Sequence, residues 1–374
     1  MCRMKVAMIG HKKIPSRLGG VEVVVEKISE GLVKRGVSVT AFNRRLSSKD
    51  KKNYIYKGIR VKTVPTIMYR GISAASSSLF ASLYVAIKPF DIVHYHAEGP
   101  AAMLWIPKIF RKKVLVTIHG LDYKRDKWGK LGQKYIEFGE WCVAKFADNI
   151  IVLNKETQNY FKNKYNRSTV YIPNGISKPN ILLPNELAKY NLKKEEYILF
   201  LGRIVPEKGI ENLIKAFKKL KTTKKLVIAG GASDTNGFFN KMKQMASSDN
   251  RIIFTGFVDG NLLSELYSNA YLYVLPSKLE GMPIGLMEAM AFGNCCLVSD
   301  IPECKNVVMN HGIVFKNNDF NDLYLKLEEL VKNPKKVEML KSKSADYILN
   351  KYQWTTVINK TLELYKESIN ENTK

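Results

Sequence analysis

The stretch PSKLEGMPIGLMEAMAFG (residues 276–293) follows an apolar strand and places two carboxylates eight residues apart. Glu280 lies in the loop, and Glu288 lies inside a helix that begins near Pro283. Eight residues are a little over two helical turns, so Glu288 points back toward the sheet edge from which the loop leaves. Because its neighbours are nearly all apolar, this carboxylate needs a partner. The pattern predicts a ligand site at a strand end, where Glu288 can accept hydrogen bonds from both hydroxyls of a ribose.

A second segment, LGRIVPEKGIENLIKAF (residues 201–217), supplies positive charge at another strand end. Arg203 and Lys208 leave the strand together, and Gly209 opens the helix that follows. Two cations beside a helix N-terminus form a suitable diphosphate site. Each unit-charge contact at about 4 Å contributes on the order of 4 kcal/mol before desolvation, at an effective dielectric constant of about 20. A solvated loop in a Lys-rich chain would look the same, but the carboxylates of residues 276–293 favour the diphosphate site.

Short apolar strands alternate with helical segments along both halves of the chain. A break rich in Pro and Asn, residues 170–190, separates the halves, and the alternation then starts again. This rhythm is typical of parallel, doubly wound sheets, which bind ligands beyond the carboxyl ends of their strands. The sequence therefore predicts two α/β domains joined near residue 175 and an amphipathic C-terminal helix within residues 352–368. The predicted strands are residues 5–10, 37–44, 59–65, 91–97, 113–120 and 149–154, then 197–202, 225–231, 251–256, 270–277 and 294–300.

In the segment IPSRLGGVEVVVEKISEGL (residues 14–32), two glycines lie between the first predicted strand and the helix that follows it. Gly19 and Gly20 at this point let a ligand approach backbone N–H groups. The segment is not a G-x-G-x-x-G motif, and the second strand, residues 37–44, ends without an acidic residue to bind the ribose of NAD. Both observations argue against a nicotinamide-dependent dehydrogenase.

The composition is that of an ordinary soluble globular protein: 374 residues, 45% hydrophobic and 25% charged. The apolar run LFASLYVAI (residues 79–87) is about half the roughly 20 residues of a membrane span. The N-terminal residues lead straight into a strand, so we expect no signal peptide. The five cysteines are scattered and form no C-x-x-C pair. We therefore expect reduced cysteines in a cytosolic protein, with neither disulfides nor a zinc site.

The formal net charge of +26 is unevenly placed. Residues 1–180 contain 33 Lys and Arg against 12 Asp and Glu, a net +21, whereas residues 181–374 contain 27 against 22, a net +5. A codon bias toward Lys would act on both halves, so the asymmetry indicates an anionic partner of the first half. Nucleic acid, an anionic membrane surface and a phosphorylated substrate all fit this charge.

The order of these motifs resembles glycosyltransferase family 4, whose members are retaining enzymes with the GT-B fold. The features that carry the resemblance are YIPNGI (residues 171–176), the Arg203 and Lys208 pair, FTGFV (residues 254–258), the Glu280 and Glu288 pair, and a closing helix with Trp354. Residues 9–29 and 117–129 are similar to bacterial members that build capsular, exopolysaccharide or O-antigen units. The resemblance covers nearly the whole chain. It implies two Rossmann-like domains facing a central cleft: an acceptor-side domain of residues 1–175, to which a helix of about residues 356–374 crosses back, and a donor domain of residues 176–355.

The resemblance implies roles for individual side chains. Arg203 and Lys208 would grip the pyrophosphate of a nucleotide sugar. Glu288 would hold the ribose, and Glu280 would lie by the transferred sugar. His119, at the end of a strand, would face this sugar from the first domain, although a lone histidine there is otherwise more often structural. These four groups, Arg203, Lys208, Glu280 and His119, are the expected catalytic set.

Backbone groups would complete the donor site. Gly19 and Gly20 would approach the phosphates as the domains close. Further N–H groups would come from Gly281, Met282, Ile284 and Gly285, whereas Pro283 has none. No metal or other cofactor is expected, because cations such as Arg203 and Lys208 neutralise the leaving group. The implied mechanism is front-face, with the leaving diphosphate helping to take the acceptor proton, and Glu280 as a nucleophile stays open.

The expected reaction moves a hexosyl or deoxyhexosyl unit from a UDP-sugar, with guanine and thymine nucleotides open, to a saccharide or polyprenyl-diphosphate-linked glycolipid. A nucleotide-sugar 2-epimerase of the same fold is the nearest alternative, and it would need no acceptor. A phosphorylase would need a lysine carrying pyridoxal phosphate, for which there is no motif. A nucleic-acid-binding protein would use the basic half, but its cations are dispersed without an interleaved aromatic motif, so we expect no nucleic acid partner.

The basic half is assigned instead to an anionic membrane surface, with the protein cytoplasmic and peripheral at the inner face of the cell membrane. Residues 69–90, YRGISAASSSLFASLYVAIKPF, form either an interfacial helix or a packed helix of the first domain. The residues expected to bind acceptor phosphates are Arg17, Lys124, Arg125 and Lys127.

Overall fold

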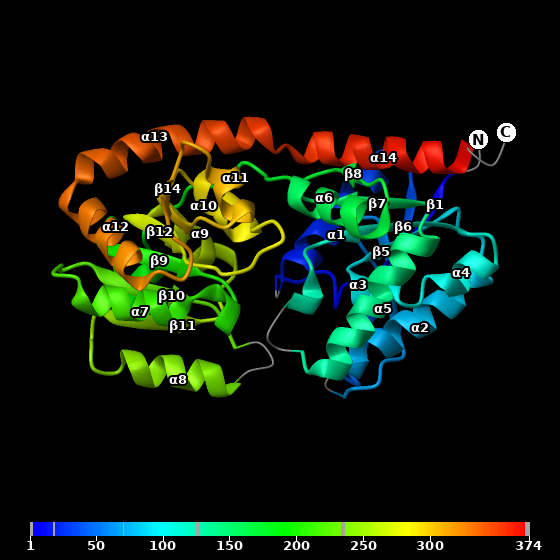
Figure 1. The fold of residues 1–374 in the computed structure, drawn as a ribbon, viewed down its shortest axis with the longest axis horizontal. Coiled ribbons are helices and arrows are strands. Elements are labelled where there is room, and N and C mark those ends of the chain that lie inside the picture. The colour runs from blue at the N-terminus through cyan, green and yellow to red at the C-terminus, as the bar shows by residue number, and fades with distance from the viewer. Residues whose placement is uncertain (1–2, 18, 70, 125–127, 233–235, 371–374) are drawn as a thin grey trace. The chain divides into compact units, whose positions relative to one another are not determined.

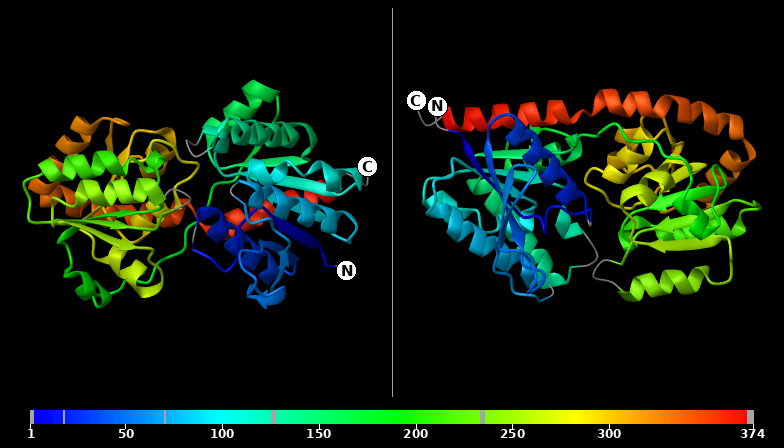
Figure 2. Two further views of the ribbon diagram at one scale, coloured as in Figure 1. Left: turned by 90° about the horizontal axis from the view of Figure 1, so that it is seen from below. Right: turned by 180° about the vertical axis from the view of Figure 1, so that it is seen from behind.

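The computed structural model describes residues 3–17, 19–69, 71–124, 128–232 and 236–370. The chain forms two compact units, the first of residues 1–175 with 354–374 and the second of residues 176–353. Each unit is a sheet with helices on both faces (Figure 1, Figure 2). The division falls within the Pro- and Asn-rich break of the sequence.

The first unit contains an 8-stranded sheet. Its strands are β1 (Lys5–Ile9), β2 (Ser38–Arg44), β3 (Asn53–Tyr56), β4 (Ile59–Val64), β5 (Ile92–His96), β6 (Lys113–Ile118), β7 (Asn149–Val152) and β8 (Val170–Tyr171). They lie in the order β3-β4-β2-β1-β5-β6-β7-β8, and the neighbours are parallel except for β3 and β4. The order reverses between β1 and β5, and doubly wound sheets bind ligands beyond the strand ends at such a switch point.

The first sheet is parallel, as predicted, except for the antiparallel β3, a strand that was not predicted from the sequence. It forms a hairpin with β4 through Lys57 and Gly58, whose φ angles are 50° and 78°. A two-residue turn of this kind matches the twist of paired strands, and glycine adopts it without steric cost. The alternating residues NYIY before the Lys-Gly pair are the sequence signal for this hairpin.

Different helices cover the two faces of this sheet. The helices of the first unit are α1 (Gly20–Lys34), α2 (Ile72–Ala86), α3 (Glu98–Ala101), α4 (Trp105–Ile109), η1 (Asp122–Lys124), α5 (Lys130–Phe146), α6 (Lys155–Tyr165) and α14 (Trp354–Asn370). Val93 and Tyr95 of β5 share a core with α2 and α5. His94 points to the opposite face because side chains alternate along a strand, and there it meets Tyr365 of α14.

Two close contacts dock α14 on the first unit. Gly31 of α1 leaves room for Ile358, because a Cβ atom at residue 31 would lie 2.2 Å from Cδ1 of Ile358. The hydroxyl of the buried Tyr365 lies 2.6 Å from Nδ1 of His94. The C-terminal helix is thus part of the first unit, although the whole second unit precedes it in the sequence (Figure 1).

The second unit contains a 6-stranded parallel sheet. Its strands are β9 (Tyr197–Leu201), β10 (Lys225–Ala229), β11 (Ile252–Gly256), β12 (Leu272–Leu275), β13 (Cys296–Ser299) and β14 (Ile313–Phe315). The order is β11-β10-β9-β12-β13-β14, which numbered from β9 is 3-2-1-4-5-6, with its switch point between β9 and β12. The short β14 was not predicted from the sequence. The helices are η2 (Glu186–Tyr190), η3 (Pro206–Lys208), α7 (Ile210–Lys219), α8 (Asn236–Ala246), α9 (Gly260–Ser268), α10 (Ile284–Ala291), α11 (Pro302–Val308), α12 (Phe320–Lys332) and α13 (Pro334–Lys351).

The cysteines of the described residues are buried free thiols, namely Cys142, Cys295, Cys296 and Cys304. Burial raises the pKa of Cys142 to about 11 and that of Cys295 to about 12, so both thiols stay protonated at neutral pH. These four cysteines form no disulfide among the described residues. Within the described ranges, no helix has the length and hydropathy needed to cross a membrane.

We expect Tyr365→Phe to destabilise the first unit, because the change leaves Nδ1 of His94 buried without this partner. An unsatisfied buried polar group costs about 1–3 kcal/mol. Urea denaturation should therefore show a lower free energy of unfolding. Tyr324→Phe in α12 is the control, because its hydroxyl bonds to Glu328 at the surface and its loss should change little. Equal effects of the two substitutions would contradict a docking role for Tyr365.

Candidate functional site

The loop after β9 lies at the switch point of the second sheet and carries the predicted cations. It runs from Arg203 into η3, and Gly209 then caps α7 with a φ angle of +67°. A Cβ atom at Gly209 would lie 1.9 Å from the carbonyl oxygen of Pro276, the first residue after β12. The N–H of Lys278 donates to the carbonyl of Glu207 at 2.8 Å. The two loops singled out in the sequence are therefore packed directly on each other.

Lys208 and Glu280 form an ion pair between Nζ and Oε1 at this junction, and both side chains are mostly buried. The hydroxyl of Ser277 donates to the same carboxylate oxygen at 2.6 Å. The hydroxyl of Ser299 in turn donates to the carbonyl of Ser277 at 2.5 Å. Because a partly buried pair with a further hydrogen bond is held more firmly than an exposed pair, Lys208 and Glu280 keep a defined geometry at the ends of β12 and β13.

Arg203 lies nearer to solvent than Lys208. Its side chain is 31% exposed, and Nη2 lies 4.0 Å from Oε1 of Glu207. Glu207 is buried, and this oxygen has no hydrogen-bond partner among the described residues. The carboxylate balances part of the guanidinium charge, while the exposure of Arg203 leaves it accessible to an incoming anion.

The N-terminal end of α10 lies over the end of β9. A Cβ atom at Gly285 would lie 3.3 Å from the hydroxyl of Tyr273 and 3.6 Å from the carbonyl oxygen of Leu201. Oε2 of Glu288 lies 3.5 Å from the hydroxyl of Tyr267, which donates to the carbonyl of Gly285 at 3.1 Å. Burial, and then the charge of Glu288, raise the pKa of Tyr267 well above its ordinary value. The tyrosine hydroxyl therefore stays protonated beside this carboxylate.

The second unit thus brings cations, carboxylates and a helix N-terminus to one switch point. Phosphate oxygens bind to such cations and to the N–H groups of a first helical turn, and carboxylates accept hydrogen bonds from sugar hydroxyls. The residues predicted to offer backbone groups lie in the loop before α10 and in its first turn, namely Gly281, Met282, Ile284 and Gly285. Within the described part of the chain, no cluster of three or more His, Cys, Asp or Glu side chains is arranged to hold a metal ion.

His119 follows β6 at the carboxyl edge of the first sheet and is half-buried. Its Nε2 lies 3.0 Å from Nδ1 of His96, the last residue of β5. His96 is fully buried, and its ring centroid lies 4.3 Å from that of His94. Burial, and then the charge of His119, lower the pKa of His94 to about 3, so its ring is neutral. Sequence analysis missed His96, although the pattern HYH puts two histidines on one strand face.

Glu98 is a second buried group that sequence analysis missed. Its Oε1 accepts from the N–H of Asp122 at 3.3 Å, and its Oε2 has no hydrogen-bond partner in the described part of the chain. Burial, followed by the charge of Asp122, raises the pKa of Glu98 well above its usual range. Burial thus favours the protonated form of this carboxyl group, which lies just after β5.

The glycines before α1 serve a close approach by a carboxylate. Gly19 caps α1 with an extended φ of −161°, and Gly20 begins the helix. A Cβ atom at Gly19 would lie 2.5 Å from Oε2 of the buried Glu22, whose Oε1 accepts from the N–H of Lys12 at 2.9 Å. A carboxylate of the protein therefore lies beside Gly19, the residue that caps the helix at which donor phosphates are predicted to bind.

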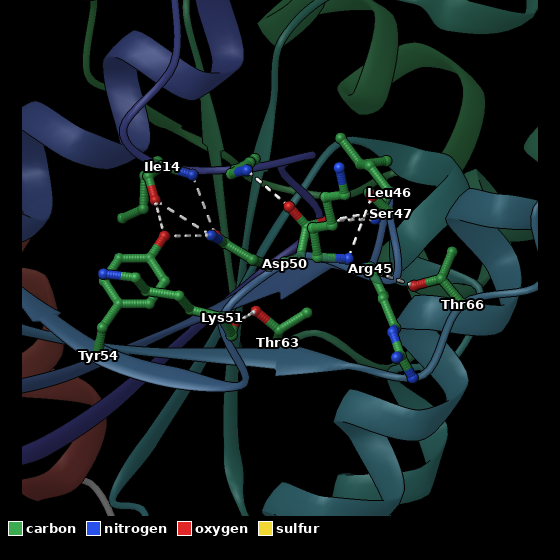
Figure 3. Close-up of polar contacts among 12 residues, drawn as sticks. Ile14, Arg45, Leu46, Ser47, Asp50, Lys51, Tyr54, Thr63 and Thr66 are labelled. Atoms are coloured by element: carbon green, nitrogen blue, oxygen red, sulfur yellow. Dashed lines mark hydrogen bonds and ion pairs between the residues drawn. The ribbon is translucent and has the colours of Figure 1, made fainter.

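The loop between β1 and α1 also contacts the β3–β4 hairpin and the turn before it (Figure 3). The hydroxyl of Tyr54 in β3 donates to the carbonyl of Ile14 at 2.5 Å. Asp50 accepts from the N–H groups of Leu46 and Ser47 at 2.7 and 2.9 Å, which closes the turn after β2. The hairpin that the sequence analysis missed thus helps to position this loop.

The predicted acceptor-binding cations are described only in part. Arg17 lies exposed in the loop before α1. Lys124 ends η1, but its side chain lies outside the described residues, as do Arg125 and Lys127. Their proposed contact with acceptor phosphates stays a prediction.

Two family models match the chain in succession. "Glycosyltransferase Family 4" matches residues 18–178, and "Glycosyl transferases group 1" matches residues 184–346. The first match lies almost wholly in the first unit and the second match lies in the second unit.

Similar proteins are named as glycosyltransferases. The chain is 25% identical over 390 residues to an uncharacterized glycosyltransferase of Methanocaldococcus jannaschii, covering 97% of this chain and 98% of the relative. It is 24% identical over 345 residues to the UDP-Gal:alpha-D-GlcNAc-diphosphoundecaprenol alpha-1,3-galactosyltransferase of Escherichia coli, covering 85% and 86%. It is 22% identical over 386 residues to the 2-deoxystreptamine N-acetyl-D-glucosaminyltransferase of Niallia circulans, covering 93% and 97%.

Solved structures share the fold over both units. Sucrose-phosphate synthase from Thermosynechococcus elongatus superposes with a TM-score of 0.82 at 20% identity, covering 98% of this chain and 99% of that one. HepE of Anabaena in complex with UDP-glucose superposes with a TM-score of 0.80 at 15% identity, covering 98% and 100%. The fold and these relatives define a GT-B glycosyltransferase, an enzyme of the hexosyltransferase class. The chain belongs to glycosyltransferase family 4.

We expect Gly209→Ala to destabilise the second unit and to weaken the binding of anionic ligands. The added Cβ atom would collide with the carbonyl of Pro276 at an unfavourable φ, so the two loops must separate. The free energy of unfolding should fall by about 2 kcal/mol or more. Gly260→Ala is the matched control, since its φ of +56° is also positive but nothing lies within 4 Å of the added atom. Equal losses in urea denaturation would show that the loop contact contributes nothing.

Proposed function

We propose that this enzyme transfers a hexosyl or deoxyhexosyl unit, with retention of configuration, from a nucleoside-diphosphate sugar to a saccharide or polyprenyl-diphosphate-linked acceptor. A UDP-sugar is the preferred donor, and the product belongs to a cell-surface polysaccharide such as a capsule or exopolysaccharide. The proposal rests on one observation: the Lys208 and Glu280 ion pair and the start of α10 both lie at the switch point of the second sheet. The UDP-Gal and diphosphoundecaprenol in the name of the Escherichia coli relative support the choice of donor and acceptor.

Each charged group of the site has one part in the proposal. Arg203 and Lys208 bind the diphosphate, and Glu288 accepts hydrogen bonds from the ribose. Glu280 lies beside the transferred sugar, and His119 of the first unit bonds to the same sugar. The chemistry of these groups suits the ligand, because guanidinium and ammonium groups donate to phosphate whereas carboxylates accept from hydroxyls.

The ion pair of Lys208 with Glu280 fits the covalent structure of such a donor. The sugar is attached directly to the second phosphate, so the cation that holds this phosphate and the carboxylate that receives the sugar must be neighbours. An ammonium group has three N–H donors, and the bond to Glu280 uses one of them. Because the ion pair fixes the Lys208 side chain, we propose that its other two N–H groups donate to phosphate oxygens.

The proposed reaction is a front-face displacement. The acceptor oxygen bonds to the anomeric carbon while the bond from that carbon to the diphosphate oxygen breaks. The hydroxyl proton moves to an oxygen of the leaving diphosphate. Negative charge grows on this group, where Arg203 and Lys208 stabilise it electrostatically, so we propose that no metal or other cofactor is required. Activity retained after dialysis against EDTA would support this point, and Glu280 as a covalent nucleophile is the alternative to be tested by trapping a glycosyl-enzyme.

We expect UDP to raise the melting temperature of the protein in a panel of UDP, GDP, dTDP, ADP and NAD at millimolar concentration. A ligand at 100 times its Kd adds about 2.7 kcal/mol, or about 2 °C or more for a chain of this size. Lys208→Ala should abolish the shift. Lys215→Ala is the matched control, because Lys215 is an exposed cation of α7 paired with Glu211 and should leave the shift intact.

A shift with NAD alone, or with none of these ligands, would contradict the proposed donor site. An equal loss of the shift in Lys215→Ala would show that overall charge rather than the site binds the nucleotide. Release of free nucleotide and an epimerised sugar in the absence of any acceptor would identify the 2-epimerase instead.

We further propose that the first unit binds the anionic inner face of the cell membrane, where a polyprenyl-linked acceptor resides. Helix α2 is packed in the unit with its small residues inward, so the packed alternative for residues 69–90 holds for its buried face. Its outward face is apolar, with Phe80, Leu83 and Ile87 being 39%, 50% and 69% exposed. A surface helix usually has its large apolar residues toward the core and polar residues toward solvent, and α2 has the opposite arrangement. Such an exposed apolar face suits an interface with lipid. The inward residues include Ser77, Ser78, Ala81, Ser82 and Ala86.

The apolar surface extends to α4, which packs on α2, and to α5. A groove of about 520 Å³ lies between α4 and α5. Its lining includes Trp105 and Trp141, which are 41% and 45% exposed, and tryptophan is favoured at membrane–water interfaces. Exposed cations lie on the same or adjoining segments and suit anionic headgroups; they are Lys88, Arg111, Lys134 and Lys145.

We expect the protein to cosediment with vesicles that contain phosphatidylglycerol and to bind pure phosphatidylcholine weakly. Brominated acyl chains should quench its tryptophan fluorescence. The double substitution Trp105→Ser and Trp141→Ser should weaken binding by about tenfold or more, because two large apolar side chains are lost from the interface. Ile181→Ser with Leu183→Ser is the control, since both residues are exposed in the second unit.

Equal binding to neutral and anionic vesicles would contradict the role of the cations. Unchanged binding by the tryptophan variant would contradict the proposed surface. A dimer in gel filtration that dissociates on Trp141→Ser, without any binding to vesicles, would assign the surface to a second copy of the chain.

A further inference from the structure

The main chain around Arg203 is fixed, whereas its guanidinium group is not. The N–H of Gly202 donates to the carbonyl of Ala229 at 3.0 Å. The N–H of Ile204 donates to the carbonyl of Gly231 at 3.1 Å. These bonds hold both sides of Arg203 against the end of β10 and the loop after it. In the described part of the chain, the guanidinium itself donates no hydrogen bond.

Glu207 presents a buried carboxylate that also lacks a hydrogen bond. It lies in η3, and its carbonyl accepts from the N–H of Lys278 at 2.8 Å, so its main chain is tied to the loop after β12. Its side chain is 8% exposed, and Oε1 is buried without a hydrogen-bond partner among the described residues. Such an oxygen is costly, because burial removes its water and supplies no donor in return.

These two groups face each other across an open gap. Nη2 of Arg203 lies 4.0 Å from Oε1 of Glu207. Charge-assisted N–H···O bonds are about 2.7–2.9 Å long, so this pair is about 1 Å too wide for a hydrogen bond. The next cation differs, because Nζ of Lys208 bonds directly to Glu280. The site therefore contains one closed cation–carboxylate pair and one open pair.

A phosphate group bound to Arg203 gives the open pair a reason to close. A guanidinium has five N–H groups in a planar fork, so it can bond to one anion at one edge and to a second anion at another. Arg203 is 31% exposed, and one edge can therefore receive a phosphate. If another edge receives Oε1 of Glu207, the two anions together fix the plane of the guanidinium. The same movement supplies the buried oxygen with a donor.

We propose that Glu207 is a positioning residue for the donor, whose Oε1 accepts a hydrogen bond from Arg203 when the guanidinium binds the diphosphate. The inference rests on the proposed function, in which Arg203 binds this diphosphate. Glu207 acts through Arg203 rather than on the ligand. Its negative charge also repels the diphosphate, so positioning and repulsion change the affinity in opposite directions.

The affinity for UDP, measured by isothermal titration calorimetry, separates positioning from repulsion. Glu207→Leu removes the acceptor and should weaken UDP binding about tenfold, as expected for residues that act in contact. In the Arg203→Ala background the same substitution should not weaken binding, because the group that it orients is gone. Tighter binding of UDP by Glu207→Leu in both backgrounds would mean that the carboxylate only repels the ligand, and would overturn the proposal.

Glu207→Gln is the conservative variant. Its amide oxygen can still accept from the guanidinium although the charge is lost. We expect its affinity for UDP to stay within about threefold of the wild-type value, since one acceptor replaces another. A loss equal to that of Glu207→Leu would assign the effect to charge alone and would overturn the hydrogen bond that we propose.

Glu211→Gln is the matched control for the lost charge. Glu211 lies in the first turn of α7, is 34% exposed, and pairs with Lys215 and Lys241. Because exposed pairs contribute little, this variant should bind UDP within about twofold of the wild type. A tenfold loss here would make the effect of Glu207→Leu one of overall charge and would overturn the proposal.

A crystal structure of the wild-type protein with UDP tests the geometry directly, even if Glu207→Leu does not fold. We expect Arg203 to contact the diphosphate and one of its guanidinium nitrogens to lie within about 3.2 Å of Oε1 of Glu207. A gap that stays at 4.0 Å or widens beside a bound diphosphate would overturn the proposal.

A failure of the proposed function would give a different result. Inorganic pyrophosphate is the second probe, because it lacks the base and should respond to the variants as UDP does. Unchanged affinity for both probes in Arg203→Ala would contradict the diphosphate site and overturn the inference with it. Weakened binding in Arg203→Ala, combined with wild-type affinity in Glu207→Leu, would contradict the positioning role alone.

Discussion

The close approach of Gly209 to the carbonyl of Pro276 is the constraint on which the site of the second unit depends. Because residue 209 has no side chain, the loops after β9 and β12 touch, and Lys208 reaches Glu280. The neighbouring strand end repeats this arrangement, since a Cβ atom at Gly230 would lie 1.8 Å from the carbonyl oxygen of Gly202. Backbone contacts thus hold together the loops that follow three adjacent strands, β10, β9 and β12. The positions of the charged side chains depend on these contacts.

Much of the second unit could be predicted from the sequence, because the alternation of strands and helices alone indicates a parallel doubly wound sheet. Parallel strands bring their carboxyl ends to one edge whatever their loops contain, so motifs near Arg203 and Glu280 were expected to be neighbours. The ion pair of Lys208 with Glu280 could not be predicted, because it depends on how closely the two loops approach each other, and no spacing along the chain encodes that approach. The short β14 was missed because three residues carry too little periodicity.

The first unit was harder to predict because its decisive groups look ordinary in the sequence. From the sequence, Glu22 looks like a favourable acid in the first turn of a helix, and only the structure shows that its carboxylate lies beside Gly19 and accepts from the N–H of Lys12. His96 reads as a residue of a buried strand, and its importance comes from one contact with His119 across to the next strand. Both contacts depend on the exact placement of side chains in the folded unit, and a single sequence does not record it.

The docking of α14 also affects the order in which the chain folds. Domains generally form as units, beginning at the N-terminus, while the chain is being synthesised. The first unit here lacks part of its core until Ile358 and Tyr365 have been made, which is after every residue of the second unit. The second unit can form its core from one contiguous stretch of chain, whereas the sheet face around His94 stays uncovered until the last helix has been made.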